Sequence, residues 1–100
     1  KSLHISFLES QTSWIFFPTE IKVEASEDGV HYSTIGKVNW PLKQDEADVQ
    51  RKTASFQFPD TPFKYIRVMA RNVGENPAWH VSPGAPCWLF VDEIRIEKAE

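Results

Sequence analysis

Two adjacent carboxylates near the end of the chain, Asp92 and Glu93, are the first residues whose chemistry suggests a function. Paired carboxylates hydrolyse glycosidic bonds, one as the acid and the other as the nucleophile or base. These two lie in an apolar run, CWLFVDEIRIE, that predicts a β-strand, in which neighbouring side chains point to opposite faces. Without a special bend they cannot act on one bond, so we expect architecture or recognition here and no catalysis. Glu93 alone is a candidate calcium ligand, although no carboxylate-rich loop supplies further oxygens.

His80, between Trp79 and Val81, is the second candidate for chemistry. A nucleophilic mechanism would need a serine on a strand–turn–helix elbow, and Ser82, followed by proline and glycine, lacks that context. A loop histidine beside a tryptophan is more often packed or hydrogen-bonded than catalytic. The chain is therefore not expected to be an enzyme.

The aromatic residues point to ligand binding instead. Four tryptophans in 100 residues are many, and Trp14 and Trp79 lie in segments rich in turn-forming residues. An indole exposed on a loop can stack on the apolar face of a sugar ring, while Arg71, Asn72 and His80 could bind the sugar hydroxyls. These five residues form the predicted ligand-binding set. The alternative is that the tryptophans fill the ends of the fold or dock on a neighbouring domain.

The elements that must position these residues are β-strands, because apolar residues alternate along the chain and seven prolines leave little room for helices. Six strands are expected, in residues 2–8, 19–26, 30–35, 52–58, 63–72 and 87–97. A tight turn at Asp28-Gly29 joins the second to the third. The pattern predicts an all-β fold, an antiparallel β-sandwich, in one domain of residues 1–100.

Two segments allow more specific expectations. Leu89 to Val91 is apolar on both faces, which predicts that the last strand is central or covered. The polar segment between the third and fourth strands is expected to be an exposed connection with one helical turn at Lys43 to Ala47.

Composition argues against several classes of partner. The net charge is −3 and no run of Lys or Arg occurs, so nucleic acid and anionic membranes are not expected as partners. The single cysteine, Cys87, cannot form an internal disulfide and is expected to be a buried small apolar residue. No Cys/His spacing typical of zinc is present.

Three stretches, WIFFPTEIKVEASEDGVHYSTIG, KYIRVMARNVGENPAWH and CWLFVDEIRIEK, resemble the discoidin-like (coagulation factor 5/8 type C) modules. They are most similar to those at the C-terminus of Bacteroides-type bacterial β-N-acetylhexosaminidases of glycoside hydrolase family 20. The resemblance implies a galactose-binding-domain-like jelly roll of about 140 residues, so this chain would lack the N-terminal strands. In sugar-binding relatives calcium is held partly by an early loop and partly by a carboxylate at the position of Glu93.

The resemblance also implies a function. The chain would be a non-catalytic accessory module of an exported enzyme, located in the periplasm, at the outer membrane or outside the cell. It would bind a hexosamine- or galactose-containing glycan, or dock on the catalytic domain, whose TIM barrel needs about 250 residues. The alternative is a discoidin adhesion module that binds a protein or lipid surface through apolar loop tips flanked by basic residues. Membrane insertion is not expected, because the loops carry acidic residues instead, namely Glu27, Asp28, Asp45, Glu46, Asp48 and Glu75.

Overall fold

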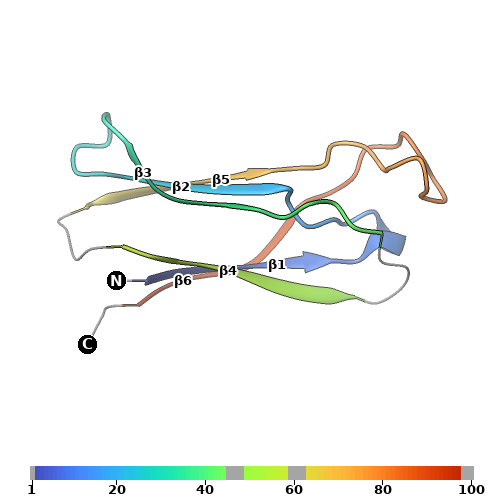
Figure 1. Ribbon diagram of the computed structural model, residues 1–100, viewed down its shortest axis with the longest axis horizontal. Coiled ribbons are helices and arrows are strands. Elements are labelled where there is room, and N and C mark those ends of the chain that lie inside the picture. Colours follow the sequence, from blue (N-terminus) through green and yellow to red (C-terminus); the bar gives the residue numbers. More distant parts are fainter. Residues whose placement is uncertain (1, 45–48, 59–62, 98–100) are drawn as a thin grey trace.

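The computed structural model describes residues 2–44, 49–58 and 63–97, and these form two antiparallel sheets. The elements are β1 (Ser2–Glu9), the 3-10 helix η1 (Gln11–Ser13), β2 (Glu20–Ser26), β3 (Ser33–Asn39), β4 (Gln50–Gln57), β5 (Tyr65–Arg71) and β6 (Phe90–Glu97). One sheet has the order β4-β1-β6 and the other β3-β2-β5, and they lie face to face (Figure 1). The predicted all-β fold with antiparallel sheets is confirmed.

The molecule is flat, with extents of 47 × 28 × 17 Å. Figure 1 looks down the shortest axis and shows the two sheets edge-on, one above the other, so the smallest extent is the width of three strands that lie about 4.8 Å apart. No helix in the described part of the chain has the length and apolar character needed to cross a membrane.

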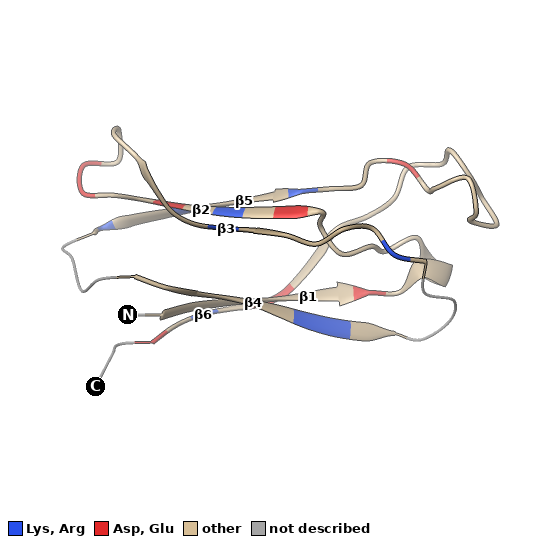
Figure 2. Ribbon diagram, in the orientation of Figure 1, with Lys and Arg blue, Asp and Glu red and all other residues tan. Residues whose placement is uncertain are grey.

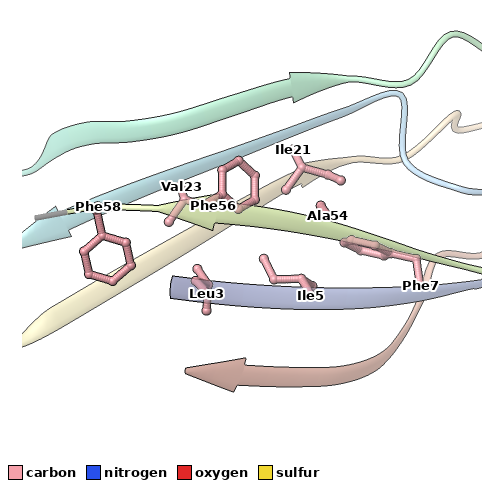
Figure 3. Close-up of a cluster of buried hydrophobic side chains, with 8 residues drawn as sticks. All are labelled: Leu3, Ile5, Phe7, Ile21, Val23, Ala54, Phe56 and Phe58. Carbon is pink, nitrogen blue, oxygen red and sulfur yellow. The ribbon is translucent and has the colours of Figure 1, made fainter. Parts of the chain in front are cut away.

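The core is formed by side chains from the two central strands, β1 and β2, and from β4. In β2, Ile21, Val23 and Ala25 are buried and alternate with polar residues, as the period-two pattern predicted. The eight side chains of the core point into the space between the sheets (Figure 3): Leu3, Ile5, Phe7, Ile21, Val23, Ala54, Phe56 and Phe58. The alternation predicted for the fourth and fifth strands is likewise present in β4 and β5.

The sandwich is closed on the side where β3 lies opposite β4. Here the ring of Phe56 from β4 packs directly on the backbone of Gly36 in β3, and a Cβ at Gly36 would overlap that ring. Phe56 is buried, so it cannot swing into solvent. Glycine is therefore required at this position by close inter-sheet packing.

The β2–β3 hairpin was predicted correctly, but β3 begins at Ser33 and not at Val30. The delay comes from a side-chain cap on the turn. One oxygen of Asp28 accepts the backbone N–H groups of Val30 and His31 at 2.8 Å. Its other oxygen lies 2.7 Å from His31 Nδ1. These bonds, the one to the His31 ring above all, lower the pKa of Asp28 well below its usual range.

The expectation for residues 43–47 can be compared only in part. Lys43 and Gln44 are not helical. The remainder of that predicted turn lies outside the described residues.

The prediction that the last strand is central or covered is wrong. β6 is at the edge of its sheet among the described strands, and all eight of its residues are exposed. Ile94 and Ile96 face inward, because they pair with the fully buried Ile5 and Leu3 of β1, yet each is 55% exposed. The reason is that β5, the edge strand of the opposite sheet on this side, does not close onto β6: Ile66 of β5 and Ile96 of β6 line an open hollow between the sheets. The inner face is therefore open along the β5–β6 side.

Candidate functional site

The five predicted ligand-binding residues all lie at one end of the sandwich, to the right in Figure 1. At this end β1, β3 and β5 finish and β2, β4 and β6 begin. The connection between β5 and β6, residues 72–89, forms the longest described loop there (Figure 1).

The 72–89 loop is held in shape by its own backbone. Asn76 is buried, and its N–H donates to Ala85 O at 2.8 Å while its carbonyl accepts Gly84 N–H at 2.9 Å. Its side-chain Nδ2 donates to Ser82 O at 2.9 Å. These three bonds tie the two arms of the loop together, so residues 77–81 between them are presented in a fixed conformation.

Trp79 is presented by this loop with 38% of its surface exposed. Its indole packs edge-on against Phe16, with ring centroids 6.1 Å apart, and contacts the His80 ring. It lines a hollow of about 210 Å³ whose other walls are Gln11, Thr12, Gln44, His80 and Val81. An indole fixed on one side and open to a hollow on the other is a suitable platform for an apolar ring face.

His80 has a structural role in this geometry. Its Nδ1 accepts the N–H of Ser82 at 3.0 Å, so the ring proton is on Nε2, which donates to Gln11 O at 2.7 Å. The ring is buried against Phe16. His80 therefore fastens the loop to η1 and offers the hollow a ring edge, with both nitrogens already hydrogen-bonded.

Asn72 and Trp14 lie at the base of the loop and do not line the Trp79 hollow. Asn72 Oδ1 accepts Gly74 N–H at 3.0 Å, and its Nδ2 donates to Cys87 O at 3.4 Å. Trp14 ends η1 in the left-handed region (φ 65°), and its carbonyl accepts the N–H of Trp88 at 2.8 Å. Both residues support the two ends of the loop.

Arg71 is exposed at the end of β5, and it too does not line the hollow. Besides His80, the polar residues that line it are Gln11, Thr12 and Gln44, and these three were not predicted. They come from two segments far from Trp79 in sequence, and no motif marks them. Cys87 is buried, as predicted.

The acidic pair of β6 departs from the prediction that its side chains face apart. β6 has a bulge here: Ser6 of β1 pairs with Glu93 and Phe7 pairs with Val91, which leaves Asp92 as an extra residue. A bulge sets two adjacent residues against one on the partner strand. Asp92 and Glu93 consequently both lie on the outer face of the sheet.

The outer face around the bulge is shallow and rich in ion pairs. Asp92 Oδ2 is 2.6 Å from Arg51 Nε, and the Glu93 side chain lines a depression with Arg51 and Arg95 among its other walls. Nearby guanidinium groups disfavour a bound cation at Glu93. The described residues contain no group of three or more His, Cys, Asp or Glu side chains that could hold a metal ion. The predicted calcium role of Glu93 thus gains no support from its surroundings.

A comparison of the chain with models of known protein families finds no match. A comparison with curated proteins finds no relative either. The likeness to discoidin-like modules therefore stays a prediction from the sequence motifs.

Proposed function

We propose that the chain is a non-catalytic accessory module of an exported bacterial β-N-acetylhexosaminidase, and that it binds a hexosamine- or galactose-containing glycan at the Trp79 hollow. The observation that carries this proposal is the Trp79 indole, fixed by Phe16 and His80 and open to a hollow with polar walls. A jelly-roll fold of the galactose-binding kind is part of the same proposal. Its additional strands would cover the open face of β6.

The chemistry of the hollow suits a neutral sugar. The Trp79 face would stack on the C–H groups of a pyranose ring, and the Thr12 hydroxyl and Gln44 amide would exchange hydrogen bonds with its hydroxyl or acetamido groups. Because the hollow is shallow, we expect a dissociation constant in the millimolar to micromolar range, about −4 to −8 kcal/mol. Attachment to an enzyme that acts on the same glycan would raise the effective concentration of sites.

Docking on the parent enzyme is the second candidate function, and a separate observation favours it. The inward row of β6, Val91, Ile94 and Ile96, is half exposed although it continues the apolar row of β1. Apolar side chains on an open sheet edge are normally covered by another strand or domain. Docking at β6 and sugar binding at Trp79 use different surfaces, so both can hold together.

Isothermal titration with N-acetylglucosamine and with galactose tests the sugar proposal. We expect saturable binding of at least one sugar, lost in Trp79→Ala and kept in Trp88→Ala, which removes a more exposed indole outside the hollow. Binding that survives Trp79→Ala, or no binding of either sugar at high millimolar concentration, would leave docking as the better account. Hydrolysis of a chromogenic hexosaminide by the purified chain would contradict the non-catalytic part.

A further inference from the structure

A second and larger hollow lies beside the Trp79 hollow, where β1 ends and β4 begins. Its volume is about 260 Å³. It opens between the two sheets, and its lining includes Glu9, Phe17, Trp40, Lys43, Arg51 and Lys52. We call it the Trp40 hollow. No residue of it belongs to the predicted ligand-binding set.

The aromatic wall of this hollow is rigid. The Trp40 ring packs edge-on against Phe7 and Phe17, with centroids 5.8 Å apart in both cases. The backbone N–H of Trp40 donates to Thr19 O at 2.9 Å. The Lys52 ammonium lies over the indole, 4.4 Å from its centroid, and is thereby held at the hollow.

The polar groups combine a buried acceptor with a lysine donor. Glu9 is only 6% exposed, and its Oε2 accepts the N–H of Phe17 at 3.2 Å, which fixes the carboxylate at the base of the hollow. The Lys52 ammonium, which lies over Trp40, supplies a donor at the hollow, and Lys43 is another of its lining residues. The Arg51 guanidinium is engaged on the outer face with Asp92. In Figure 2 the acidic end of β1 lies close to the basic start of β4.

A carboxylate that accepts hydrogen bonds and ammonium groups that donate them, next to an indole, match neighbouring hydroxyl groups on a sugar ring. Each hydroxyl can donate to Glu9 and accept from a lysine at the same time. An acceptor and a donor beside an indole suit a neutral polyhydroxylated group.

The two hollows share one wall. Lys43 lines the Trp40 hollow, and the next residue, Gln44, lines the Trp79 hollow. Gln11, at the base of the Trp79 hollow, holds this wall in place because its Nε2 donates to Lys43 O at 3.0 Å. Because residues adjacent in sequence line the two hollows, we expect adjacent units of one sugar chain to reach both.

On the basis of the function proposed above, we propose that the Trp40 hollow is a second sugar subsite. The ligand is then an oligosaccharide that crosses the Lys43–Gln44 wall, with one unit stacked on Trp79 and another hydrogen-bonded by Glu9 and Lys52. A single terminal sugar fills only half of the site. Affinity should consequently rise with chain length.

Calorimetric titration with N-acetylglucosamine, its dimer and its tetramer tests this subsite. We expect the tetramer to bind about tenfold more tightly than the monosaccharide, as one or two added hydrogen bonds would give. Lys52→Met, which keeps a side chain over Trp40, should weaken tetramer binding about three- to tenfold and leave monosaccharide binding unchanged. Glu9→Gln should have the same selective effect. The control is Lys64→Met, an exposed lysine just before β5, at the opposite end of the sandwich.

The possible results separate this subsite from the function on which it rests. Monosaccharide binding that Trp79→Ala abolishes, together with equal affinity for the tetramer, would overturn the second subsite and leave the first intact. An equal loss for both ligands in Lys52→Met would also overturn it. No binding of any of the three sugars would refute the subsite and the sugar-binding function together. Thermal unfolding of each variant shows whether it is folded under the titration conditions.

Discussion

Ile5 and Ile94 face each other across β1 and β6, and replacing each by alanine measures how far the core extends. Both point to the inner side of the same sheet, but Ile5 is 0% exposed and Ile94 is 55% exposed. Removing a fully buried isoleucine side chain costs about 2 to 5 kcal/mol, because burial is lost and a cavity is left.

The expected cost at Ile94 is smaller for two reasons. A fully buried isoleucine contributes about 1.5 to 3 kcal/mol through removal from water, and less than half of Ile94 is buried, which gives about 1 kcal/mol. No cavity forms, because the site is already open. We therefore expect Ile5→Ala to lower the free energy of unfolding at least twice as much as Ile94→Ala.

Urea denaturation, monitored by circular dichroism, gives the loss in free energy of unfolding for each variant. The two losses are compared on condition that the free energy falls with urea concentration at the same slope in both variants. If Ile94→Ala costs as much as Ile5→Ala, β6 is covered in solution, and the description of an open inner face is wrong. If the stability of the unmutated chain then rises with protein concentration, the cover over β6 is a second copy of the chain.

Two further perturbations test other parts of the structure. Gly36→Ala should destabilise the fold by about 1 to 3 kcal/mol, because the added methyl group would overlap the buried Phe56 ring. A free energy of unfolding equal to that of the unmutated chain, measured by urea denaturation, would contradict this packing. The Asp28 turn should weaken in acid: its pKa is lowered in the folded state, so its contribution is present above the ordinary aspartate pKa and is lost as pH falls below it. Asp28→Asn should flatten this acid dependence in unfolding curves, and an unchanged pH profile would show that the cap adds nothing to stability.

Much of the fold could be predicted because a strand with one solvent-exposed face has a local pattern of alternating apolar and polar residues. Ile21, Val23 and Ala25 alternate with charged residues, and their burial follows from that spacing alone. Whether β6 is covered could not be predicted in this way. Its apolar run indicates surfaces that favour burial, but whether a strand lies over them depends on tertiary pairing.

Among the residues that line the candidate site, the sequence indicated a ligand-binding role clearly only for Trp79. Trp79 stood out as an aromatic residue in a turn-rich segment, whereas Gln11 and Gln44 join it through contacts between distant segments. His80 could be found but not assigned, since its role depends on hydrogen bonds to Gln11 and Ser82. The bulge at Asp92 was hidden because register shifts arise from pairing with β1.

The most direct test of sugar binding at the Trp79 hollow is a nuclear magnetic resonance titration of the labelled chain with N-acetylglucosamine and galactose. We predict that the indole N–H of Trp79 and the amides of Thr12 and Gln44 shift with saturation, while the indole of Trp88 stays in place. Saturable shifts confined to other regions, or unchanged Trp79 and Thr12 resonances at high millimolar sugar, would contradict the proposed site.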